Sequence, residues 1–320
     1  MAMQPMTFRQ KILLAAIQST SGAPVGLTGA HAIDVNNLVI SYQQGDAISK
    51  EVDRLGEGNF GEIKTKLRTE LSFEVYAAGA GVAGTAPGYG PLLRACGYAE
   101  TLTAGTAVTY ELADGNYEMI TAAFMRVAAG NKMQQHIIDG ARGLVELSLK
   151  EGELPKFSFS SMMGGYNAPS EVAVLTPDTS AFKDPVPPSA VNTPTATVDD
   201  IDIALTELTL ASGGTVERID RPNQKETALY KMQPTGKLTF IAPASLAAVN
   251  WFSKTRSDNG VQVSTLKVVH GTVAGNIIEL EVTAQLTNLS ESEINGQVAY
   301  SFDLKPLPNA SNVGIKITVR

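Results

Sequence analysis

Apolar and polar residues alternate along several stretches of the chain, and this pattern constrains the fold more than any other feature. In residues 68–76, Leu71, Phe73 and Val75 alternate with polar side chains. A strand with this pattern buries one face and exposes the other, as strands of antiparallel sheets do. The same alternation recurs in residues 154–160, 278–285 and 297–304. The sequence therefore predicts a mainly β protein built of antiparallel sheets of sandwich or barrel type, with one short helix per domain.

Helical patterns are few and short. Residues 88–97 and 243–255 are the two helix candidates, and Pro243 suits a first helical position because its missing N–H costs little there. The apolar run ILLAAI at 12–17 is shorter than the ~20 residues that span a membrane and too short for a confident signal peptide. We interpret residues 7–18 as a short helix with Thr7 as its N-cap.

A proline-rich stretch divides the chain. Residues 177–194 contain five prolines and no periodic apolar pattern, which indicates an extended linker. We expect a first domain at 1–176, a linker at 177–198 and a second domain at 199–320. Each domain has one strand that leads into a short helix, ELSFEV in the first and KLTFIA in the second. This loose correspondence favours two tandem domains of one topology, the alternative being two unrelated β-rich domains.

Residues 43–65 form a long stretch of mixed charge, punctuated by glycines, between two predicted strands. Loops of this length without a core of their own are uncommon and tend to be functional or disordered. The stretch is either a surface excursion or a segment that becomes ordered against another subunit.

No constellation of residues points to catalysis. The motif GAGVAG at 79–84 fits the glycine pattern of a dinucleotide site, but Thr85, Ala86 and Pro87 separate it from the helix that should open there. The three histidines are isolated, and the single cysteine, Cys96, allows no intrachain disulfide. The net charge of −7 lacks the basic surplus of a tight nucleic-acid binder. We expect no enzyme, no cofactor and no metal site.

One stretch carries a resemblance to a known family. LSFEVYAAGAGVAGTAPGYGPLLRACGYAET at 71–101 resembles the major tail tube proteins of bacteriophages with long, non-contractile tails. KILLAAIQSTSGAPVGLTGAHAIDVNNLVISY before it and GARGLVELSLKEGELPKFSFSSMMGGY after it resemble the lead and the closing hairpin of that family's tube domain. The resemblance covers most of residues 7–170, and residues 199–308 resemble a second, degenerate tube-type domain.

The resemblance implies a structural protein of the virion that is assembled in the host cytoplasm. Its β-sandwich domains form rings whose inner sheets join into one barrel, and the rings stack into a tube through which DNA leaves the capsid. It implies homotrimeric rings of pseudo-six-fold shape, or homohexameric rings if the second domain only decorates the outside. The partners implied are further copies of the chain, the tape measure protein, DNA in transit, and the tail terminator and distal tail proteins, with no membrane.

The long stretch at 43–65 matches the family's inter-ring loop in place and length. The residues that we expect to contact the neighbouring ring are Gln43, Asp46, Lys50, Glu51, Asp53, Arg54, Glu57, Phe60 and Glu62.

A tube that conducts DNA should not hold it, because each phosphate–cation contact adds affinity. The polar faces of the predicted strands carry six acids against the three bases Lys150, Lys156 and Lys237. We hypothesise that some of these faces line the lumen. The acids expected there are Glu70, Glu74, Glu146, Glu279, Glu281 and Asp303.

Two other functions compete with the tube. One is a β-sandwich module for binding or adhesion on a virion or cell surface, which an exposed aromatic cluster would favour, although aromatic residues make up only 6% of the chain. The other is an enzyme that uses the glycine-rich loop.

Overall fold

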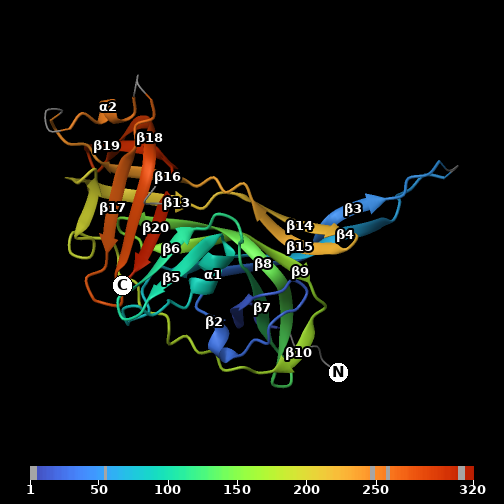
Figure 1. Ribbon diagram of the computed structural model, residues 1–320. Coiled ribbons are helices and arrows are strands. Elements are labelled where there is room, and N and C mark those ends of the chain that lie inside the picture. Colours follow the sequence, from blue (N-terminus) through green and yellow to red (C-terminus); the bar gives the residue numbers. More distant parts are fainter. Residues whose placement is uncertain (1–5, 54–55, 246–248, 257–259, 309–313) are drawn as a thin grey trace.

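The computed structural model describes residues 6–53, 56–245, 249–256, 260–308 and 314–320, and these form two layers of β-sheet around one main core (Figure 1). The described chain is mainly β-strand, and its paired strands are antiparallel, as the alternating pattern predicts. The first half contains β1 (Lys11–Gln18), the 3-10 turn η1 (Gly29–His31), β2 (Ala32–Ile33), β3 (Asn36–Ser49), β4 (Glu62–Tyr76), α1 (Gly90–Ala95), β5 (Tyr98–Thr103), β6 (Ala107–Leu112), β7 (Met119–Ala128), β8 (Lys132–Lys150), β9 (Lys156–Tyr166) and β10 (Ser170–Ala173). The second half contains β11 (Thr195–Val198), β12 (Ile201–Asp202), β13 (Ala204–Ala211), β14 (Thr215–Arg221), β15 (Gln224–Tyr230), β16 (Thr235–Ile241), α2 (Trp251–Lys254), β17 (Ser264–His270), β18 (Ile278–Ile294), β19 (Gln297–Pro306) and β20 (Ile315–Val319).

One layer, the main layer, runs through both halves of the chain. Its strand order is β3–β4–β9–β8 in the first half, continued by β13–β16–β19–β18 in the second. The two halves join where β8 pairs with β13, with Ser148 opposite Thr209. The main layer is therefore a single sheet to which each half contributes four strands in corresponding order.

The covering layer packs against the other side of the core. In the first half it consists of β2, β1, β7, β10 and the N-terminal part of β8. In the second it consists of β12, β11, β17, β20 and the N-terminal part of β18, and β20 also pairs with β6 of the first half. The long strands β8 and β18 thus occupy the same position in each half, since each begins in the covering layer and ends in the main layer.

A short helix closes the core in each half. Leu92, Leu93 and Cys96 of the α1 segment are fully buried, and α1 agrees with the helix predicted at 88–97. In the second half Trp251 is 1% exposed and packs on Phe240, with ring centroids 4.8 Å apart. The predicted helix at 243–255 is shorter in the structure, because α2 begins at Trp251, where Asn250 caps it, and Pro243–Ser245 is not helical. Residues 246–248 lie outside the described residues.

The prediction of a helix at 7–18 is wrong. Residues Lys11–Gln18 form β1, which pairs with β7 along its whole length. Leu13 faces one core cluster and Leu14 faces a second, smaller one, so both faces of this strand are covered. A strand buried on both faces reads as a continuous apolar run, and such a run cannot be told from a helix by periodicity alone.

The proline-rich stretch lies between β10 and β11 and contains no helix or strand from residue 174 to 194. Phe182 from this stretch packs against the core beside Gly88. The ring of His270 on β17 forms hydrogen bonds with the Val186 carbonyl and the Thr193 hydroxyl, each at 3.0 Å. The extended chain is therefore held along the surface of both halves.

Candidate functional site

The outward face of the main layer is a continuous polar surface, called here the polar face. Directly opposed residues on antiparallel strands point to the same side of a sheet, so the register shows which side chains share this face. Glu74 lies opposite Ser158, which lies opposite Glu146, which lies opposite Ala211 across the boundary between the halves. In the second half Thr209 lies opposite Lys237 and Lys237 opposite Asp303, so the surface crosses from one half to the other without interruption.

Charges of both signs are interleaved on the polar face. Lys156 contacts Glu74 at 2.8 Å, and this hydrogen bond holds the pKa of the Glu74 carboxyl below its usual value despite partial burial. Arg68 contacts Glu70 at 2.7 Å. A shallow hollow of about 390 Å³ lies where β8, β13, β16, β18 and β19 meet, and Glu146, Lys237, Asp303 and Lys305 are among its lining residues. Its charges are as mixed as those of the rest of the face.

The structure places four of the six acids that were predicted to face a lumen on one surface. Glu70, Glu74, Glu146 and Asp303 are on the polar face. Sequence analysis missed Glu207 and Lys305, which lie on the same face opposite Lys150 and Gln285.

Glu279 and Glu281 lie on a different part of the sheet from the other four acids, and their place in a lumen stays a prediction. They lie on the part of β18 that pairs with β17 and β20 in the covering layer. Lys267 contacts Glu279 at 2.7 Å, and Lys316 contacts Glu281 at 3.3 Å. Burial alone would raise the pKa of Glu279, but hydrogen bonds from Lys267 and Arg320 outweigh it and leave the pKa below its usual value. Both acids are therefore ion-paired within the covering layer.

The stretch at 43–65 is not simply a loop, because residues 43–49 belong to β3 and residues 62–65 belong to β4. β3 and β4 form one long hairpin whose outer part projects from the body of the protein (Figure 1), and we call residues 43–65 the first arm. Of the residues predicted to contact a neighbour, Gln43 and Asp46 are on β3 and Glu62 begins β4. Lys50, Glu51, Asp53, Glu57 and Phe60 are in the turn region between the strands, and Arg54 lies outside the described residues.

A second arm, residues 212–233, projects from the equivalent place in the second half and was missed by sequence analysis. It is the hairpin β14–β15, inserted between β13 and β16 as the first arm is inserted between β3 and β4. Its signal in the sequence is the turn-forming RPN at 221–223 between two short alternating stretches.

The second arm lies against the first half of the same chain. Arg218 is 2% exposed and donates to Thr227 within the arm, while its guanidinium approaches Gly165 of β9 closely enough that a Cβ there would be 2.8 Å away. Arg142 of β8 donates to the carbonyl of Thr227 at 2.5 Å. This arm is therefore fixed by buried polar contacts to strands of the other half.

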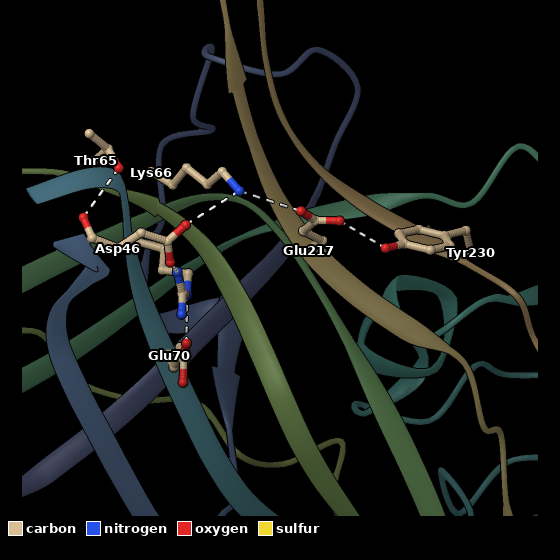
Figure 2. Close-up of polar contacts among 7 residues, drawn as sticks. Asp46, Thr65, Lys66, Glu70, Glu217 and Tyr230 are labelled. Atoms are coloured by element: carbon tan, nitrogen blue, oxygen red, sulfur yellow. Dashed lines mark hydrogen bonds and ion pairs between the residues drawn. The ribbon is translucent and has the colours of Figure 1, made fainter. Parts of the chain in front are cut away.

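The two arms meet in a polar network at the base of the first arm (Figure 2). Lys66 lies between Asp46 and Glu217, 3.3 Å from the former and 3.6 Å from the latter, and Tyr230 donates to Glu217 at 2.8 Å. The hydrogen bond from Tyr230, followed by the charge of Lys66, lowers the pKa of Glu217. The network joins β4 of the first half to β14 and β15 of the second.

The glycine-rich loop also joins the two halves. The N–H of Gly79 donates to the Asn276 side chain at 2.6 Å, and that of Gly81 donates to the Gly275 carbonyl at 2.8 Å. A Cβ on Gly79 would come within 2.0 Å of the Gly275 oxygen. These glycines allow close backbone approach between the halves, and their N–H groups are directed at the protein itself.

Both ends of the main layer are open edges. Among the described residues, β3 pairs only with β4, and beyond Thr287 β18 pairs only with β19. An open edge presents unpaired N–H and C=O groups that favour pairing with another chain. In the repeated strand order, β18 corresponds to β8, and β3 corresponds to β13. Strands β8 and β13 pair with each other inside the chain.

Among the described residues, no group of three or more potential metal ligands is present, and no helix is long and apolar enough to cross a membrane. No family model matches the sequence, and no curated protein matches it.

Proposed function

We propose that this chain is a self-assembling structural subunit that forms rings, and that the rings stack into the tail tube of a long-tailed bacteriophage. The observation that carries the proposal is the pairing of β8 with β13 inside the chain, together with the open edges at β3 and β18. The pairing of β8 with β13 inside the chain shows how the corresponding strands, β18 and β3, would pair between two copies. If β18 of one copy pairs with β3 of the next, every main layer continues into its neighbour.

Closure into a ring is the arrangement that such edges favour. A sheet that ends in two complementary open edges either extends without limit or closes on itself, and closure removes the edges. Because both halves contribute four strands to the main layer, the second half is a wall element in this arrangement rather than an external decoration. This supports rings of three chains with pseudo-six-fold shape over rings of six.

The polar face suits the lining of a DNA channel. Polycation surfaces hold nucleic acid through counterion release, so a lumen must avoid a basic surplus. The face combines Glu70, Glu74, Glu146 and Asp303 with lysines that are partly neutralised by ion pairs such as Lys156–Glu74. It is a mixed-charge surface and is less acidic than the sequence suggests. It offers DNA few unpaired basic side chains to bind. In this proposal the tape measure protein occupies the lumen before DNA, and the tail terminator and distal tail proteins cap the ends.

Negative-stain electron microscopy of the purified protein over a range of concentrations tests the proposal. Rings or hollow tubes are the expected result. Dispersed monomers at all concentrations would contradict it and would favour the alternative of a binding or adhesion module on a virion or cell surface.

A further inference from the structure

Three basic side chains gather at one end of the core without a carboxylate partner. Lys11 on β1 lies opposite Arg126 on β7, and His136 on β8 lies opposite Phe124, two residues before Arg126 on the same face. We call Lys11, Arg126 and His136 the basic cluster. Within the described residues none of the three forms an ion pair, although Lys11 donates to the Leu38 carbonyl at 2.5 Å.

The cluster has unused hydrogen-bonding capacity. His136 is 9% exposed, and its buried Nε2 has no hydrogen-bond partner among the described residues; the same is true of the buried Nε of Arg126. Burial, followed by the charge of Arg126, lowers the pKa of both His136 and Lys11. Unpaired buried donors and neighbouring like charges are both unfavourable, and one bound anion would relieve both.

An aromatic frame with exposed parts surrounds the cluster. The Tyr42 ring is 4.6 Å from the His136 ring, and Lys11 lies 4.3 Å from the centroid of Phe8. Tyr42 is 38% exposed and Phe8 is 71% exposed. The surface thus combines positive charge with an apolar rim, which fits a peptide that carries both carboxylates and apolar side chains.

The tip of the first arm has this composition. Glu51, Asp53 and Glu57 are exposed, and none of them forms an ion pair among the described residues. Ile48 and Val52 beside them are 58% and 50% exposed. β3 spans roughly 23 Å from Tyr42 to Ser49 at ~3.3 Å per residue, so the tip is carried away from the cluster of its own chain.

We propose that the basic cluster receives the acidic tip of the first arm from a second copy of this chain. This inference rests on the proposed function, in which the first arm reaches another subunit, and it names the surface that the arm binds. The carboxylates of Glu51, Asp53 and Glu57 accept from Arg126 and His136, and the apolar side chains of the tip cover Tyr42 and Phe8. The cluster lies among covering-layer strands and not on the polar face, which favours a protein segment over DNA in the lumen.

Charge reversal on each side of the contact tests the inference. The tip variant is Glu51→Lys with Asp53→Lys and Glu57→Lys, all at exposed positions where folding is not at risk. The cluster variant is Arg126→Glu, with Arg126→Gln as a second version in case the reversed charge prevents folding. Lys132→Glu, an exposed lysine on β8 outside the cluster, is the matched control. Circular dichroism checks the fold, light scattering gives the elongation rate, and negative-stain microscopy gives tube lengths.

The tip and cluster variants should each elongate about tenfold more slowly than the unaltered chain, because charges at an interface act mainly on association. The chain that combines the tip reversal with Arg126→Glu should recover most of the rate, and Lys132→Glu should match the unaltered chain. Normal elongation of a folded cluster variant, or no recovery in the combined chain, would overturn the inference while tubes of the unaltered protein still support the proposed function. If the unaltered chain forms no rings or tubes, both proposals fail. Retention of added DNA by the unaltered chain, lost in Arg126→Gln, would reassign the cluster to a nucleic acid.

Discussion

The two arms are the same structural element in two different situations. Each is a hairpin inserted between corresponding strands of the main layer, β3 and β4 in the first half and β13 and β16 in the second. The second arm buries Arg218 and Leu229 against the body of its own chain. The first arm leaves Ile48 and Ile63 58% and 73% exposed. The comparison teaches that one arm packs on a surface of its own chain, while the other leaves apolar side chains exposed, which in the proposed assembly a second copy covers.

Removal of the first arm should have the largest effect on assembly and a small effect on folding. Among the described residues, deleting 46–61 removes exposed side chains and the half-buried Phe60, so the free energy of unfolding should change by no more than about 1 kcal/mol. Rings should still form through β3 and β18, but they should not elongate. Size-exclusion chromatography and electron microscopy give the answer, and tubes of normal length from the deleted chain would break the comparison.

In the second arm the largest effect should be on stability. Arg218→Ala removes a buried guanidinium and its hydrogen bond to Thr227, and it should lower the free energy of unfolding by about 2–4 kcal/mol. Arg221→Ala, at the exposed end of the same strand, is the matched control and should change it by less than about 0.5 kcal/mol. Urea unfolding, at protein concentrations too low for assembly, measures the free energy of unfolding of both variants. Equal effects of the two substitutions would show that the second arm is no better fixed than the first.

The base of the first arm should respond to pH through His136. Burial, followed by the nearby charge of Arg126, lowers the pKa of this histidine from 6.5, while Tyr42 faces it without a charge at neutral pH. The unfolded chain then binds a proton more readily than the folded one, so stability should fall as the pH drops through 6.5 towards the lower pKa of the folded state. His136→Gln should remove this slope. Unfolding at a series of pH values between 7.5 and 5 measures it, and an unchanged slope in the variant would assign the effect to another group.

The contact between the two arms should be the weakest of these effects. Lys66 and Glu217 are 38% and 48% exposed and 3.6 Å apart, and exposed ion pairs contribute little (Figure 2). A double-mutant cycle with Lys66→Ala and Glu217→Ala should give a coupling energy of about 0.2–0.5 kcal/mol. A value above about 1 kcal/mol would mean that the first arm is already held by its own chain.

The alternation of apolar and polar residues made the strands predictable, but it did not predict which strands pair with one another. Ile278, Leu280 and Val282 are buried as the pattern predicts. However, the pattern says only which residues of one strand share a side, and it cannot say which layer the strand belongs to. Glu279 and Glu281 illustrate this, because β18 pairs with β17 and β20 in its first part and with β19 in its second part. The first arm was predicted to be a loop because its sequence lacks alternation of apolar and polar residues. Its hairpin projects from the body of the protein and therefore buries few side chains.

The open edges test the central claim most directly. The register of the repeated strands places Ser41 of β3 where Thr209 lies on β13, and Ile294 of β18 where Ser148 lies on β8. Cysteines at positions 41 and 294 of one chain should therefore meet between copies, and Cys96 is fully buried and gives little background. With a short bis-maleimide, the chain carrying both cysteines should be converted into a closed covalent trimer, whereas chains carrying one cysteine should stay monomeric. A product that stays monomeric at concentrations where copies associate would contradict the claim that these two edges pair.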